Sequence, residues 1–245
     1  MSNPPQLQRG KDRLIALFRS GDVFRSRSVS DLVLTATVDV PALPARLTAD
    51  WEREVSRHLR LEPGDVEPLP LARARLRWPD LRHCVQAASD WTRTLGLHDV
   101  IAASDVALMA CRGARYHHDG AQYGGAAFCN LFLSEDRGLD VHFPVTGHRI
   151  PLVRGTALLF DTGQPHAVVQ RHGAGFDVAD FAPATDCTQV FLTWELPIVN
   201  TDVARVLGID FDIEPAMALR GDAEQVWRNG ARATVCPQSG CWRDG

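Results

Sequence analysis

Between residues 104 and 198 the chain is built from short segments in which apolar and β-branched residues alternate with polar ones. Alternation of this kind is typical of β-strands with one buried face. Turn residues separate the segments, as at Gly124-Gly125 and Arg154-Gly155. Many short strands with regular turns predict a mainly β fold, a double-layered jelly roll (double-stranded β-helix) with flanking helices. The predicted strands are Val106–Cys111, Ala126–Leu133, Leu139–Phe143, Ile150–Val153, Thr156–Asp161, His166–Gln170 and Gln189–Leu196.

The segments on either side of this region have a different pattern. Apolar residues at helical spacing predict supporting helices, and prolines predict a loop over residues 62–70. We therefore expect a single domain over 1–245, with N-terminal support (1–103), a β-helix core (104–198) and a C-terminal helical extension (199–245). The predicted helices are Lys11–Arg19, Thr48–Leu61, Asp80–Leu97, Thr201–Leu207 and Asp222–Arg232; Asp31–Val40 is a predicted strand, and 171–187 a long loop near the site.

Composition narrows the class of protein. The 245 residues are 45% hydrophobic and 23% charged, with a net charge of −4. A soluble globular protein has such values, and a negative net charge favours neither nucleic acid nor an anionic membrane as a partner. The N-terminus shows no signal-peptide pattern, and no apolar run reaches the ~18–20 residues that span a bilayer. Six scattered cysteines in a chain of this size predict a cytoplasmic protein with free thiols.

Three residues within the predicted strands have the chemistry of a metal site. His117 and Asp119 form an H-x-D pair, and residues i and i+2 of a strand point to the same face. His166 opens a later strand after a turn, so it can approach from the opposite sheet. Two imidazoles and one carboxylate suit Fe(II) and leave coordination positions open. H-x-D is also a common tripeptide, and His166 taken alone is compatible with a core histidine.

In the order and spacing of its predicted strands and of His117, Asp119 and His166, the chain resembles the Fe(II)/2-oxoglutarate-dependent dioxygenase superfamily, especially its prolyl-hydroxylase-like branch. The resemblance covers roughly residues 104–198. It implies a double-stranded β-helix in which His117, Asp119 and His166 are catalytic iron ligands. The motifs that carry it are His117-x-Asp119, the strand 127–133, the segment 150–155, the strand 156–160, Pro165-His-Ala-Val168 and the closing strand 189–194.

The resemblance also implies a reaction. Enzymes of this kind use Fe(II), O2 and the cosubstrate 2-oxoglutarate, which is decarboxylated to succinate as the substrate is oxidised. We expect hydroxylation of a small molecule, an amino acid-like compound or a natural-product intermediate. The protein would supply an open coordination site and a dry, shaped cavity.

The cosubstrate pocket departs from the family pattern. The family commonly places Arg or Lys on the closing strand, where it pairs with the distal carboxylate of 2-oxoglutarate. Here Gln189 takes that position. Arg171 and Arg115 are the candidate replacements, and Asn130 and Tyr123 are further candidates for binding cosubstrate or substrate.

Two other interpretations are compatible with the sequence. One is an iron jelly-roll oxygenase that does not use 2-oxoglutarate and whose substrate binds the metal directly; the missing closing-strand cation favours it. The other is a non-catalytic β-roll binding domain with structural histidines. An iron oxygenase, with or without 2-oxoglutarate, requires Fe(II) binding. A non-catalytic binding domain does not. The sequence leaves the oligomeric state open.

Overall fold

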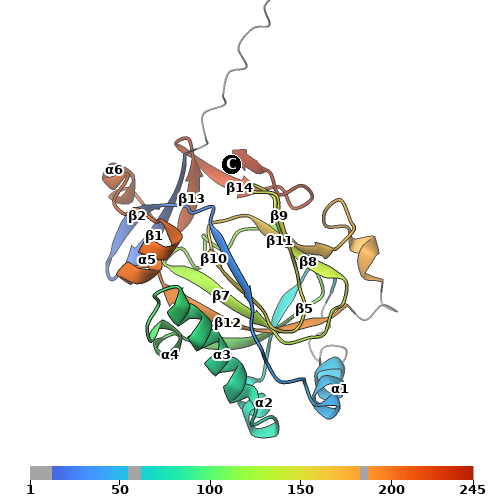
Figure 1. Cartoon of the computed structure of the whole chain (residues 1–245). Coiled ribbons are helices and arrows are strands. Elements are labelled where there is room, and N and C mark those ends of the chain that lie inside the picture. The colour runs from blue at the N-terminus through green and yellow to red at the C-terminus, as the bar shows by residue number, and fades with distance from the viewer. Residues whose placement is uncertain (1–12, 55–61, 183–186, 245) are drawn as a thin grey trace, which may run out of the picture.

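The computed structural model describes residues 13–54, 62–182 and 187–244. Two antiparallel sheets face each other at its centre (Figure 1). Their strands are β3 (Val33–Thr37), β4 (Val66–Leu69), β5 (Val106–Cys111), β6 (Ala114–His117), β7 (Ala126–Phe132), β8 (Leu139–Phe143), β9 (His148–Pro151), β10 (Thr156–Asp161), β11 (His166–Gln170) and β12 (Gln189–Pro197).

The order of the strands is that of a double-stranded β-helix. One sheet has the order β3-β10-β7-β12-β5-β4 and the other the order β6-β11-β8-β9. From β5 to β12 the chain therefore changes sheet at every connection except the β8–β9 hairpin. This arrangement confirms the predicted jelly-roll fold class. β5, β8, β10 and β11 begin and end at the predicted residues, because short runs of apolar and β-branched residues bounded by turn residues are a local signal.

Two apolar clusters lie on opposite faces of the six-stranded sheet. On its outer face, helical residues such as Trp51 and Trp91 pack with Leu131 and Trp194. Between the sheets, Phe160 belongs to a second cluster formed by strands of both sheets. The helices thus close one face of the sheet, and the space between the sheets holds the pocket described below. The helices are α1 (Ala45–Glu54), α2 (Leu71–Arg77), α3 (Leu81–Thr94), α4 (Val100–Ala103), α5 (Thr201–Leu207) and α6 (Pro215–Ala218), with a 3-10 helix, η2 (Val178–Phe181).

The two ends of the chain form a third sheet, which the sequence analysis did not predict (Figure 1). The predicted helix Lys11–Arg19 is instead β1 (Leu14–Ser20), which pairs with β2 (Val23–Ser28) and β13 (Gln225–Arg228). Residues 15–18 are all buried, so their pattern has no helical or strand period, and long-range pairing decides the structure.

The predicted helix Asp222–Arg232 is also wrong, and with it the purely helical C-terminal extension. The chain forms a hairpin of β13 and β14 (Ala231–Val235), followed by β15 (Trp242–Asp244). Asn229 and Gly230 have φ angles of 50° and 89° in the turn. Asn-Gly is a strong signal for such a turn, and it was available in the sequence.

Smaller differences occur before the core. Part of the expected loop 62–70 is β4, an edge strand that pairs with β5 and accommodates Pro68. The predicted helix Thr48–Leu61 corresponds to α1, and its residues 55–61 lie outside the described ranges. The predicted helices at α3 and α5 and the strand at β3 are confirmed. In the described ranges, no helix has the length and apolar character needed to cross a membrane.

Candidate metal centre

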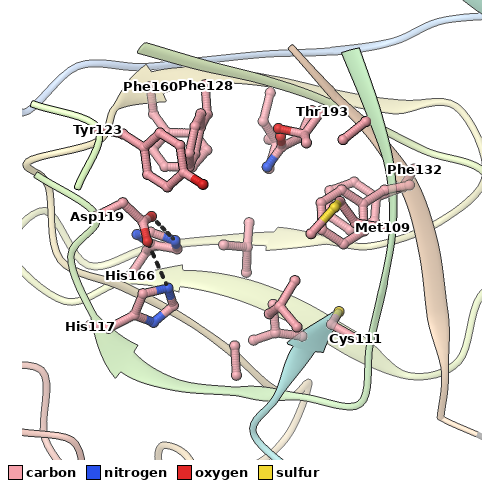
Figure 2. Close-up of a pocket in the computed structure, with 18 of the residues that line it drawn as sticks. Met109, Cys111, His117, Asp119, Tyr123, Phe128, Phe132, Phe160, His166 and Thr193 are labelled. Atoms are coloured by element: carbon pink, nitrogen blue, oxygen red, sulfur yellow. Dashed lines mark ion pairs between the residues drawn. The ribbon is translucent and has the colours of Figure 1, made fainter. Parts of the chain in front are cut away.

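His117, Asp119 and His166 converge at one end of the space between the sheets. His117 ends β6, Asp119 follows two residues later, and His166 begins β11 directly opposite His117. Each histidine Nε2 lies 3.6 Å from a different carboxylate oxygen of Asp119. The potential ligand atoms all lie within 4.8 Å of one another, so a single metal ion could bind all three (Figure 2).

Backbone carbonyl groups hold both imidazole rings in the orientation that a metal needs. His117 Nδ1 lies 2.6 Å from the Arg115 carbonyl oxygen, and His166 Nδ1 lies 3.1 Å from that of Gln164. Since a carbonyl only accepts hydrogen bonds, each Nδ1 carries the proton and donates it. Each Nε2 then has a free lone pair, which points toward Asp119.

Burial keeps His166 neutral. Its pKa falls from the usual 6.5 to about 4, first because burial penalises the charged ring and second because His117 is close. Asp119 acts in the opposite direction with a smaller effect. At neutral pH the His166 ring is therefore an uncharged potential ligand. His118, by contrast, points away from the site and lies 5.3 Å from the Trp242 ring.

A buried ion pair supports the turn between β10 and β11. Arg27 of β2 donates two hydrogen bonds, of 2.7 and 2.9 Å, to Asp161, and both side chains are fully enclosed. Asp161 also accepts a hydrogen bond from the backbone N–H of Gly163. The same turn supplies the Thr162 carbonyl, which accepts a 2.8 Å bond from the Asp119 N–H. The terminal sheet is thereby connected to two of the three candidate ligands.

The triad opens onto a cavity of about 260 Å³ between the two sheets. This volume is close to the lower end of the range for small-molecule sites, ~300–1,000 Å³. Most wall residues come from alternate positions of the core strands, as the two-residue period of a strand requires. They are Ala107, Met109 and Cys111 of β5, Ala114 and His117 of β6, Phe128, Asn130 and Phe132 of β7, Val141 of β8, Leu158 and Phe160 of β10, His166 and Val168 of β11, and Phe191, Thr193 and Glu195 of β12, with Val66, Asp119 and Tyr123.

The chemistry of the wall changes across the cavity. Figure 2 shows the triad on one side and Met109 and Phe132 on the other. Phe132 stacks on Phe191 with ring centroids 5.0 Å apart. Asp119 and Glu195 contribute carboxylates, and no arginine or lysine lines the cavity within the described ranges.

Two of the predicted ligand-binding residues, Asn130 and Tyr123, lie in the cavity wall. Asn130 Oδ1 is buried and has no hydrogen-bond partner in the described structure. It faces Thr193 across the β7–β12 register. Tyr123 turns its hydroxyl into the cavity (Figure 2). The cavity therefore offers a ligand uncharged hydrogen-bonding groups.

Arg115 does not face the cavity as strand alternation predicts. Pairing of β6 with β11 matches His117 to His166 but Ala114 to Val168, so three residue steps on β6 oppose two on β11. This bulge brings Ala114 and His117 to the cavity and turns Arg115 outward. Its side chain is 50% exposed, lies 3.7 Å from Asp65 and stacks over the Phe176 ring. It lines a separate groove that reaches the outer side of His117.

Arg171 and Gln189 also lie outside the cavity wall. The Arg171 guanidinium binds Asp136 through two hydrogen bonds of 2.8 Å and Asp140 through one of 2.9 Å. Gln189 is fully buried and donates to the Leu152 carbonyl at 3.2 Å. The structure thus brings neither residue to the candidate metal centre.

The sequence analysis did not predict most of the residues that line the cavity. Phe191, Thr193 and Glu195 lie at alternate positions of one predicted strand, so they were accessible to the same two-residue periodicity. The fact that this face points toward the metal centre, rather than toward the helices, depends on how the two sheets pack.

No family model matches the chain, and no curated protein matches it. Solved structures to which it is distantly similar include prolyl hydroxylases and an alpha ketoglutarate dependent epimerase. A Pseudomonas putida prolyl-4-hydroxylase is 17% identical, with 67% of this chain and 92% of that chain covered and a TM-score of 0.40. The non-heme alpha ketoglutarate dependent epimerase SnoN from nogalamycin biosynthesis is 15% identical, with coverages of 67% and 78% and a TM-score of 0.34. A viral collagen prolyl hydroxylase from Paramecium Bursaria Chlorella virus-1 is 10% identical, with coverages of 67% and 94% and a TM-score of 0.36.

Proposed function

We propose that the chain is a mononuclear non-haem Fe(II) oxygenase that acts on a small molecule inside the cavity. The observation that carries the proposal is the convergence of two Nε2 atoms and one carboxylate at the end of a mainly apolar cavity. Two imidazoles and a carboxylate fit Fe(II), and they leave positions on the ion for further ligands. Fe(II) bound there would supply oxidation of the substrate by O2.

The residues of the chain would contribute position and environment. The backbone carbonyl groups of Arg115 and Gln164 accept hydrogen bonds from the two imidazole rings. These bonds keep the proton of each ring on Nδ1. The Thr162 carbonyl orients the backbone at Asp119. The apolar wall would keep water from a reacting substrate.

The residues fit 2-oxoglutarate less well than they fit the metal. One carboxylate of this cosubstrate would reach the metal, but the described wall gives the other carboxylate no cationic partner. We therefore derive no step through 2-oxoglutarate and favour the alternative in which the substrate itself binds the metal. Hydroxylation would need a two-electron donor besides O2, whereas entry of both oxygen atoms of O2 into the metal-bound substrate needs none. We therefore propose dioxygenation of a substrate that is small, as the cavity size supports.

An anaerobic Fe(II) titration tests the proposal. We expect one Fe(II) per chain, with an affinity that falls by at least about 100-fold in Asp119→Ala, because loss of a ligand carboxylate removes both charge and a bond to the metal. His172→Ala, which removes an exposed histidine from outside the cavity, is the control. Iron affinity that is equal in all three proteins would refute the ligand assignment and would favour a non-catalytic β-roll.

A further inference from the structure

Apart from the three candidate ligands, the described cavity wall lacks the cationic side chain that would bind the second carboxylate of a dicarboxylate. From this wall we infer that the site takes a molecule with a metal-chelating head and an uncharged, mainly apolar body, in preference to 2-oxoglutarate. The inference rests on the proposed iron site and adds the class of ligand to it.

The first argument is charge. Asp119 and Glu195 are the charged carboxylates of the described wall, and nothing in that wall is a lysine or an arginine. A metal ion would offset Asp119 and attract one anionic head group. A second carboxylate, placed farther into the cavity, would meet only neutral groups and Glu195. The neutral groups supply no positive charge to offset the burial of a second carboxylate, and Glu195 would repel it, so this position disfavours a second carboxylate.

The second argument concerns the residues at the start of the closing strand, β12. The Gln189 side chain donates to the Leu152 carbonyl and does not line the cavity. The next residue on the same side of β12 is Phe191, which lines the cavity and stacks on Phe132. An aromatic pair thus occupies this part of the wall. Aromatic rings bind an apolar or aromatic group through contact area and ring stacking.

The third argument is that the guanidinium groups near the site face away from the cavity. Arg115 lies in the outer groove beside His117, 3.7 Å from Asp65 and over the Phe176 ring. Arg171 is paired with Asp136 and Asp140. Arg149 donates to the Gly173 carbonyl and Arg112 to the Phe181 carbonyl, both at 2.8 Å. None of the four lines the wall, and a turn of any of them into the cavity would give up these contacts.

The polar groups of the wall fit one uncharged substituent. Asn130 Oδ1 is buried without a partner, and Thr193 lies opposite it on β12. Tyr123 also turns its hydroxyl into the cavity (Figure 2). A hydroxyl or an amide N–H on the body of the ligand would donate to Asn130 Oδ1. The ligand class is therefore a chelating acid with an apolar body and one neutral hydrogen-bonding group.

The test compares two probes with the same chelating head. 2-Oxoglutarate and 4-methyl-2-oxopentanoate are both 2-oxo acids, but the tail of the first ends in a carboxylate and that of the second is an isobutyl group. Each is titrated anaerobically into Fe(II)-loaded full-length protein, and Kd is read by calorimetry and by the visible charge-transfer band. We expect the apolar acid to bind at least about tenfold more tightly. Equal or tighter binding of 2-oxoglutarate, or binding of neither acid to the iron-loaded protein, overturns the inference.

A gain-of-charge variant sharpens the test. Phe191→Arg introduces the missing cation into the wall and is expected to reverse the preference for the two acids. Thr193→Arg, at a less buried position of the same strand face, serves if Phe191→Arg does not fold. Val178→Arg, at an exposed position outside the cavity, controls for added charge and should leave both Kd values unchanged. A folded Phe191→Arg protein that keeps the preference for the apolar acid counts against the inference.

Iron content is measured first on every protein. If the protein binds no Fe(II), the proposed function itself is wrong. If it binds Fe(II) and prefers 2-oxoglutarate, only the inference about the ligand is wrong.

Discussion

Arg27 and Asp161 form a two-point ion pair in which both side chains are completely enclosed. Arg27 belongs to the terminal sheet, and Asp161 ends the strand that leads into the His166 turn. Without Arg27, the buried Asp161 carboxylate keeps hydrogen bonds from the backbone N–H groups of Ser30 and Gly163 but has no charged partner. We therefore expect Arg27→Leu to lower the free energy of unfolding by about 3–5 kcal/mol.

The same variant should also weaken iron binding, because the turn that Asp161 supports holds both His166 and Asp119. Urea unfolding and Fe(II) titration of the folded fraction measure the two effects. Arg25→Leu, at the exposed pair with Asp212, is the matched control and should cost far less stability, because water screens exposed charges. Similar stability losses in the two variants would contradict a special role for the buried pair.

Arg171→Ala should affect stability but not binding at the metal centre. The substitution leaves the buried Asp140 carboxylate without its 2.9 Å partner, at a cost of about 1–3 kcal/mol. The guanidinium does not line the cavity, so the Kd values of Fe(II) and of the two 2-oxo acids should stay within about twofold of wild type. Calorimetry checks this, and a selective loss of 2-oxoglutarate binding would restore Arg171 as the cosubstrate anchor.

Acid should destabilise the metal-free protein through His166. The unfolded chain takes up a proton near pH 6.5, whereas burial holds the pKa of the folded His166 at about 4. The folded state is thus penalised as the pH falls from 6.5 to 4, by a total on the order of 3 kcal/mol. Urea unfolding of the metal-free protein at several pH values measures the slope. In His166→Asn the slope should be smaller over this range, and an unchanged slope would exclude His166 as its source.

The cysteines should differ sharply in reactivity. All six are free, and Cys241 is the exposed one. Burial raises the pKa of Cys84, Cys111 and Cys129 to about 12, so these thiols stay protonated and unreactive in the folded protein. A disulfide reagent at pH 8 should modify Cys241 first, and Cys84, Cys111 and Cys129 only after unfolding. Cys241→Ser should abolish the fast phase; its persistence would mean that another thiol is accessible in the native protein.

The sequence determined the parts of this protein that depend on local pattern. Short apolar and β-branched runs between turn residues predicted the core strands, and four of them begin and end at the predicted residues. The H-x-D motif, the later His166 and the family resemblance predicted the triad, and its potential ligand atoms lie within 4.8 Å of one another. Residue type and turn signals are local properties of the sequence, so they are readable without knowledge of the partner strands.

Tertiary structure decided the features that depend on which segments pair. The strand β1 is apolar at consecutive positions, so only its pairing with β2 and β13 made it a strand. A bulge against β11 turned Arg115 out of the cavity, and two carboxylates held Arg171 away from it. These outcomes depend on register and on contacts between segments distant in the chain, which a local period does not encode. The sequence therefore identified the candidate metal ligands, and the packing of the sheets decided the chemistry of the wall that faces them.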